Sequence, residues 1–281
     1  MQRHSFKYLA PGKVVSYLIL GLWTLMVFWI VGWILIASLS TTREIFTNKM
    51  LASGFHFDTY INVFVSNNVG RYIANSIIYV IGSLAFILLI SAPASYVLSR
   101  YEFPGKDLLR TLFVSGMAIP SALLLIPLFS VMIYLNLTGT VFGLILVYVG
   151  TSIPFTVFFL TGFFSTLPKE LEEAACLDGC SPMQAFWQIM LPLAQPGLIT
   201  VAVFNFMFLW NDYIWALIFT NGAEQRPLSL GLQSMVQSMR VTGNYAGIFA
   251  AVIIVFLPTF ILYVFMSEKI ISGITAGAVK S

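Results

Sequence analysis

Residues that could do chemistry are scarce in this chain, and the most unusual of them is Asp212. It is an acid inside a long apolar stretch, next to Trp210, Asn211, Tyr213 and Trp215. Such an acid could carry protons, bind hydroxyl groups of a solute or cap a kink, and the rings could stack on a solute or form an interfacial belt. We treat these five residues as candidates for a pathway or gate, and we favour a structural or gating role for Asp212.

Cysteine and histidine do not combine into a metal site. Cys176 and Cys180 are spaced i, i+4, but a zinc site needs more than two ligands, and His4 and His56 are on distant segments. Two cysteines also exclude a disulfide framework. The pattern contains no Ser–His–Asp set and no paired carboxylates of the kind a membrane enzyme would need, so we predict no metal and no catalytic residue.

The chain has no loop for binding the phosphates of ATP. Such a loop needs the pattern G-x-x-x-x-G-K-[ST]. Lysine follows glycine only at Gly12-Lys13 and Gly105-Lys106, and both places lack the first glycine and the following hydroxyl residue. We therefore predict no cofactor in this chain.

Composition defines the class of protein that carries these residues. Hydrophobic residues make up 59% of the 281 residues and charged residues 9%, whereas a typical soluble domain has about 25% charged residues. A soluble protein of this size could not keep so much apolar surface away from water, so we predict an all-α integral membrane protein. The net charge of +3, without a basic run, argues against nucleic-acid binding.

The charged residues divide the chain into membrane spans. Several stretches without Lys, Arg, Asp or Glu exceed the roughly 20 apolar residues of a bilayer-spanning helix, and none shows the alternation typical of a barrel. We place a turn at residues 136–140 and a helix break at Gln195-Pro196-Gly197. Residues 1–281 then form one transmembrane domain with six predicted helical spans, at about 14–38, 73–98, 110–134, 141–165, 197–219 and 245–267.

The distribution of Lys and Arg predicts the orientation. An even number of spans puts both termini on one side. Nine Lys or Arg residues then flank the inner ends of the spans and five flank the outer ends, which favours cytoplasmic termini. A loop at 167–196 and a tail at 268–281 are therefore expected in the cytoplasm.

The loop at 167–196 differs from the rest because five of its charges fall within ten residues. Pro168 and the acids after it suit the first turn of a helix, and Gly179 is a natural C-terminal stop. Ser181 and Gln184 have the spacing of a capping box for a second helix. We predict two short helices.

The first of these helices has a face of small apolar residues, formed by Leu171, Ala174 and Ala175. Small side chains let another protein approach closely, which suits a docking surface. A connector that lies on the membrane surface without a partner would have the same composition, and composition alone favours neither interpretation.

These residues resemble a known family. Glu173-Ala174-Ala175, Gly179, Ile189 and Leu191-Pro192 have the spacing of the EAA loop of ABC-importer membrane subunits. Cys180 departs from that pattern, since alanine is more usual there. The similarity extends over nearly the whole chain and points to the carbohydrate-uptake, maltose-type branch, through Asn75-Ser76, residues 94–96 and 99–106, Trp210-Asn211-Asp212 and residues 273–280.

The resemblance implies the type I ABC-importer permease fold with a cytoplasmic coupling helix in a cleft of an ATP-binding subunit. Glu173 would pair with a basic group of that subunit, Ala174 and Ala175 would permit close packing, and Gly179 would make the bend. The supporting residues would be Asp178, Ile189, Leu191 and Pro192. The tail residues expected to contact the ATPase pair are Ala276, Gly277 and Lys280.

We therefore predict a membrane subunit of an ATP-driven, binding-protein-dependent importer of a carbohydrate, in a bacterial or archaeal plasma membrane. It is not expected to be an enzyme itself. The implied partners are a second related permease, two ATP-binding subunits that hold ATP and Mg, and an extracytoplasmic solute-binding protein. The alternatives are a proton-coupled secondary transporter that uses Asp212 and a membrane scaffold, and the EAA spacing argues against both.

Overall fold

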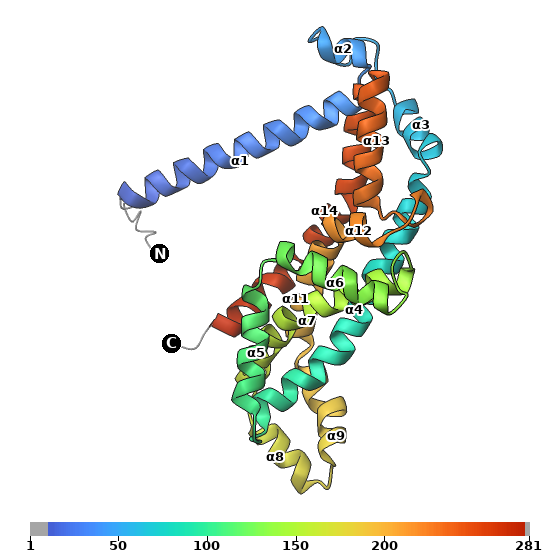
Figure 1. Ribbon diagram of the computed structural model, residues 1–281. Helices are drawn as coiled ribbons and strands as arrows, with labels where there is room; N and C mark the ends of the chain where they lie inside the picture. Colours follow the sequence, from blue (N-terminus) through green and yellow to red (C-terminus); the bar gives the residue numbers. More distant parts are fainter. Residues whose placement is uncertain (1–10, 279–281) are drawn as a thin grey trace, which may run out of the picture. The chain divides into compact units, whose positions relative to one another are not determined.

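The computed structural model describes residues 11–278, with side chains for residues 12–267. This part of the chain is helical and contains no strand. Its contacts fall into two compact units, unit 1 (residues up to 67 and 235–254) and unit 2 (residues 68–234 and those from 255 on). Figure 1 shows the helices in chain order.

The two units divide the helices between them. Unit 1 contains α1 (Pro11–Ser38), α2 (Thr42–Phe46) and α3 (Asp58–Ser66). The helices α13 (Leu228–Thr242) and α14 (Tyr245–Ala278) contribute to both units. Unit 2 contains the remaining elements, which are α4 (Val69–Arg100), α5 (Lys106–Ala118), α6 (Ser121–Tyr134), α7 (Val141–Thr166), α8 (Glu170–Leu177), α9 (Pro182–Ala185), the π-helix η1 (Phe186–Met190), α10 (Leu191–Leu193), α11 (Gln195–Asn211), α12 (Ile214–Phe219) and the 3₁₀ turn η2 (Ala223–Gln225).

Four of the described helices are long and apolar enough to cross a membrane by themselves, namely α1, α4, α7 and α14. Two bent helix pairs bring the number to as many as six. The first is α5 with α6, and the second joins residues 182–193 to α11. An all-helical membrane protein is therefore confirmed.

The third predicted span, 110–134, is not one helix. It consists of α5 and α6, which meet at an angle of 106° at Ile119 and Pro120. Pro120 has no N–H to continue the ladder, and it disfavours a helical conformation at Ile119, which is extended. The other span prolines, Pro93, Pro127, Pro154 and Pro258, stay inside their helices.

The fifth predicted span, 197–219, is broken as well. The helix α11 begins at Gln195, inside the expected helix break, and ends at Asn211; α12 follows after Asp212 and Tyr213. Asp212 is extended, so it lies in a break between two helices rather than in the middle of one.

The core of unit 2 lies mainly between α4 and α7. Tyr79 and Ile87 of α4 are fully buried, as are Leu144, Tyr148 and Leu160 of α7. This pairing is what positions the loop after α7, because α8 begins a few residues beyond the end of α7.

Unit 1 is tied together where its helices begin and end. Thr41 and Glu44 form a capping box at α2, and Ser53 donates two hydrogen bonds to the Glu44 carboxylate. Hydrogen bonds from the Thr41 backbone, and from the side chain and backbone of Ser53, lower the pKa of Glu44 to about 2. The Ala246 N–H donates to the Thr42 hydroxyl, so the start of α14 is fixed to α2.

Candidate functional site

The loop after α7 forms two short helices, as the sequence predicts. The first, α8, ends at Gly179, which has a φ of +84°. The Cys180 N–H donates to the Ala175 carbonyl (2.9 Å) and the Gly179 N–H to the Cys176 carbonyl (3.1 Å). This is a Schellman motif, and glycine suits its left-handed position because it has no Cβ. The bend expected at Gly179 is therefore present.

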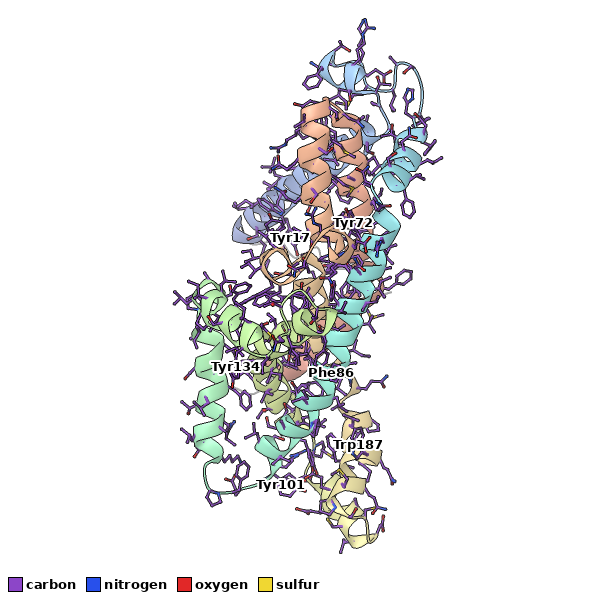
Figure 2. The ribbon with its side chains drawn as sticks, turned by 45° about the vertical axis from the view of Figure 1, so that its right-hand side comes forward. Tyr17, Tyr72, Phe86, Tyr101, Tyr134 and Trp187 are labelled. Atoms are coloured by element: carbon purple, nitrogen blue, oxygen red, sulfur yellow. The ribbon has the colours of Figure 1, made fainter. Side chains whose placement is uncertain are left out.

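The second helix begins with the capping box that the sequence indicates. The Ser181 hydroxyl accepts from the Gln184 N–H (3.3 Å), and the Gln184 side chain accepts from the Ser181 N–H (2.8 Å). After one turn the helix continues as the π-helix η1 and then α10, a detail with no recognisable sequence signal. In Figure 1, α8 and α9 project together from one end of unit 2, and Figure 2 shows Tyr101 and Trp187 at that end.

The small-residue face predicted for α8 is divided between the surface and the interior of the chain. Ala175 is 3% exposed and packs within the chain, and the Glu172 side chain is 20% exposed. Leu171 and Ala174, predicted to share a face with Ala175, are exposed. The free surface of α8 is therefore formed by the residues on its other sides, which include Glu173, Ala174, Leu177 (89% exposed), Asp178 and Gly179.

The other predicted loop residues lie elsewhere. Ile189 and Leu191 are half-buried and pack against a core cluster that includes Phe163, Phe186 and Met190. Pro192 is exposed and stands in the first turn of α10. Ile189 and Leu191 hold the loop against the membrane helices, while α8 carries the free surface of the loop.

An ion pair that the sequence analysis missed joins α8 to α4. Arg100 Nε lies 3.1 Å from Glu172 Oε1, and the Arg100 side chain is only 3% exposed. Both residues were visible in the sequence as charges, but nothing local indicates that the end of α4 meets the start of α8.

Charges also fix the turn between α4 and α5. Lys106 Nζ donates to Glu102 Oε1 at 2.6 Å. This hydrogen bond, with the charge of Lys106, holds the pKa of Glu102 below its usual value.

Asp212 joins three helices. Tyr148 of α7 donates its hydroxyl to Asp212 Oδ2 at 2.9 Å, and the same oxygen accepts from the Ala216 N–H at 3.0 Å. Ser229 donates to the Asp212 carbonyl. The carboxylate therefore caps α12 and fixes the break after α11, as a structural role requires.

The aromatic neighbours of Asp212 are divided between core and surface. Trp210 and Trp215 are buried within the chain, and the Trp210 ring stacks on Phe206 with centroids 5.3 Å apart. Asn211 and Tyr213 are exposed. A pathway or gate role for the five residues remains a prediction, and its exposed candidates are Asn211 and Tyr213.

Asn75 and Ser76, which the resemblance singled out, fasten the segment before α13 to α4. Asn75 Nδ2 donates to the carbonyls of Glu224 (2.8 Å) and Arg226 (3.0 Å), and the Leu228 N–H donates to Ser76 Oγ (2.7 Å). Their role in this structure is to position residues 224–228.

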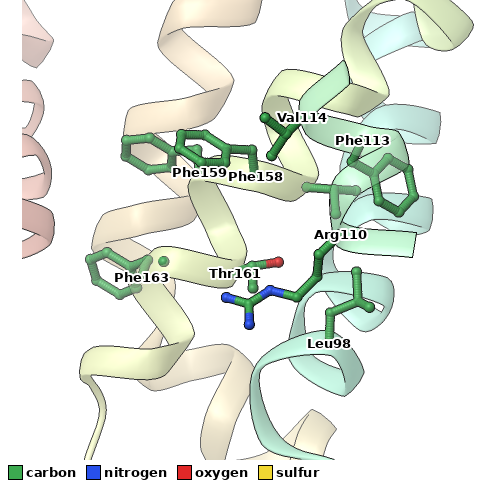
Figure 3. Close-up of a pocket in the computed structure, with 10 residues that line it drawn as sticks. Leu98, Arg110, Phe113, Val114, Phe158, Phe159, Thr161 and Phe163 are labelled. Atoms are coloured by element: carbon green, nitrogen blue, oxygen red, sulfur yellow. The ribbon is translucent and has the colours of Figure 1, made fainter. Parts of the chain in front are cut away.

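Two cavities in unit 2 open beside α7. One, of about 300 Å³, lies between α5 and α7, and Figure 3 shows Arg110 extending across it towards Thr161. The other, of about 250 Å³, lies between α7 and α11 and is lined by Thr151, Ser152 and Asn205 together with three phenylalanines. No group of three His, Cys, Asp or Glu residues suited to a metal ion occurs in the described part of the chain.

The fold is that of an ABC-importer membrane subunit. The chain superposes on the crystal structure of a bacterial ABC transporter involved in the import of the acidic polysaccharide alginate with a TM-score of 0.81. The match covers 93% of this chain and 99% of that chain, at 22% identity.

The chain belongs to the family of binding-protein-dependent transport system inner membrane components, whose sequence profile matches residues 87–270. It is 34% identical to the diacetylchitobiose uptake system permease protein NgcG of Streptomyces coelicolor, over 95% of this chain and 88% of that protein. It is 33% identical to the trehalose transport system permease protein SugB of Mycobacterium tuberculosis, over 88% and 90%. The protein is thus a multi-pass membrane component of a transport system, and the expected family is confirmed.

Proposed function

We propose that this chain is the membrane subunit of an ATP-driven importer that carries a carbohydrate or a sugar derivative inward. The observation that carries the proposal is family membership over most of the chain, together with relatives whose names specify disaccharide-type solutes. The hydroxyl groups of Thr151 and Ser152, beside the aromatic rings that line the same cavity, would suit contacts with a sugar.

We further propose that α8 is the coupling helix. An exposed helix with acidic and small residues, ended by a sharp turn, presents a docking surface of one charge sign. Glu173 and Asp178 would face basic groups of an ATP-binding subunit, and Ala174 would permit close approach. Leu177, an apolar side chain almost fully exposed, would be covered there.

A coupling role for α8 implies further subunits of the transporter. A second related permease would complete the pathway, two ATP-binding subunits would hold ATP and Mg, and a solute-binding protein would deliver the solute outside. Loop 167–196 and both termini would be cytoplasmic in a bacterial or archaeal plasma membrane. ATP binding would favour the outward-open state, and ATP hydrolysis would return the subunit to the inward-open state. Of the tail residues expected to contact the ATPase pair, Ala276 and Gly277 lie in the last turn of α14, and Lys280 lies outside the described residues.

The test is purification of the chain from its native membrane, followed by mass identification of the proteins that accompany it. The wild type should bring an ATPase, and the Glu173→Lys plus Gly179→Arg variant should lose it. Because arginine at a φ of +84° is strained whatever the space around it, Glu173→Lys alone is the second variant. This single variant reverses the charge of the exposed Glu173 side chain and keeps Gly179.

The matched control is Asp107→Lys, which reverses an exposed acid at the start of α5, outside the loop. It should keep the ATPase. Purification of the wild type without any ATPase, or equal recovery from all variants, would contradict the coupling assignment.

The alternative function, a proton-coupled transporter that uses Asp212, is not supported by the contacts of Asp212 or by the family. The Asp212 carboxylate is engaged by Tyr148 and by backbone N–H groups of α12, as a helix cap is, and the family is one of binding-protein-dependent systems.

A further inference from the structure

The strongest unassigned feature is the ion pair between Arg100 and Glu172. It is the most enclosed of the ion pairs in the described part of the chain, with 3% and 20% of the two side chains exposed. Breaking an enclosed pair by removing one partner leaves an uncompensated charge, so the arrangement strongly favours keeping the two residues together. Exposed ion pairs, such as that of Arg71 with Glu224, impose no comparable constraint.

Arg100 makes a second contact from the same guanidinium group. Its Nη2 donates to the Leu167 carbonyl at 2.7 Å, and Leu167 is the C-terminal cap residue of α7. Arg100 is itself the last residue of α4. The carboxyl ends of both helices carry partial negative charge, which a cation between them offsets. One side chain therefore joins the ends of α4 and α7 to the first turns of α8.

Aromatic packing around Tyr96 fixes the position of the Arg100 side chain at the end of α4. Tyr96 lies one turn before Arg100 and is buried, with its ring against Phe164 of α7 (5.7 Å), Phe186 of η1 (5.0 Å) and Tyr101 (5.8 Å). The end of α4 is thus packed against both the helix before α8 and the helix after it. If α8 is displaced, Glu172 must either leave Arg100 or carry the ends of α4 and α7 with it.

We propose that the Arg100–Glu172 pair is a positioning contact that makes α8 move together with the ends of α4 and α7. This inference rests on the proposed function, because the displacement of α8 would be imposed by the ATP-binding subunit. Glu173 and the loop tip would then dock, while Glu172, which faces Arg100 and is partly buried, transmits the movement. Two adjacent acids would have different partners, one outside the chain and one inside it.

The experiment uses the complete complex in proteoliposomes with its binding protein and the solute that the purification identifies. The measured quantity is the number of solute molecules imported per ATP hydrolysed. Glu172→Gln and Arg100→Gln should each lower this ratio roughly fivefold or more, the lower end of typical coupling between sites, while the ATPase remains in the complex. The double variant should be no worse than either single one, because the pair is already broken. Glu172→Asp, which keeps the charge, should restore part of the ratio.

The control variant is Asp107→Asn, which neutralises an exposed acid at the start of α5, outside the loop, and should leave the ratio unchanged. A purely structural role would lower the yield of complex, import and ATP hydrolysis in proportion, with an unchanged ratio. That result, or additive losses in the double variant, would overturn the inference. Loss of the proposed function has a different signature, since no ATPase would then accompany even the wild type.

Discussion

At the scale of single residues, Asp212 gives the sharpest prediction. Asp212→Ala removes the acceptor of the buried Tyr148 hydroxyl and of backbone N–H groups at the start of α12. Leaving buried donors unpaired costs roughly 1–3 kcal/mol, so the variant should unfold at lower temperature than the wild type. Asp212→Asn keeps an acceptor oxygen and should lose less stability and only part of the transport activity. The measurements are thermal unfolding in detergent and solute uptake into vesicles.

Tyr148→Phe is the matched variant, because it removes one donor to Asp212 and leaves the backbone cap intact. Its loss of stability should be the smaller, about 0.5–1.5 kcal/mol. Complete loss of uptake in a stable, fully assembled Asp212→Asn complex, with uptake in the wild type driven by a pH gradient, would instead indicate a proton carrier.

Residues with local signals were predictable from the sequence, and residues with distant partners were not. Gly179, Ser181 and Gln184 act within a few residues of themselves, so a spacing is enough to identify their roles. The partner of Arg100 is on another helix, and so is the partner of Asp212. No spacing within the chain identifies either partner, because packing between helices creates both contacts, that of α4 with α8 for Arg100 and that of α7 with α11 and α12 for Asp212.

At the scale of elements, the crossing of α7 and α11 depends on a glycine. A Cβ at Gly197 would stand 2.5 Å from Phe163 Cγ, so Gly197→Ala forces the ring or the helix to move. Such overpacking costs roughly 1–3 kcal/mol. The expected result is a lower unfolding temperature of the purified chain.

The matched control is Gly150→Ala in α7, where an added Cβ meets nothing within 4 Å. Alanine has the higher helix propensity, so this variant should be neutral or slightly more stable. Equal behaviour of the two variants would contradict the close packing at Gly197.

The sequence predicted most element positions but not their breaks. Long charge-free stretches identify spans because the bilayer sets their length, and the pattern located α4 and α7 to within a few residues. The same rule treats residues 110–134 as one unit, although Pro120 ends α5 and redirects the chain by 106°. The residues on both sides of this bend are apolar, so composition does not reveal it. The signal in the sequence is Pro120, which has no backbone N–H. The break at Asp212 depends on its side chain capping α12, which composition does not show.

At the scale of the whole molecule, composition indicates an integral membrane protein. Many large apolar side chains are exposed on the chain by itself, including those along α1, as expected of a subunit surrounded by lipid and other subunits. The loop after α7 combines acidic charge with a sharply ended helix. The proposed function places energy supply on partner subunits that would dock at that loop.

This division of labour predicts how the assembly responds to removal of divalent cations. Adding EDTA to the purified complex should abolish ATP hydrolysis, because Mg would be held with ATP on the partner subunits. The same treatment should leave the unfolding temperature of the isolated chain unchanged, since the described residues offer no cluster of three metal ligands. Fluorescent ATP analogues should bind to the complex and not to the isolated chain, whose sequence has no phosphate-binding loop. Saturable nucleotide binding by the isolated chain, or a lower unfolding temperature of that chain in EDTA, would show that it supplies part of the energy-coupling chemistry itself.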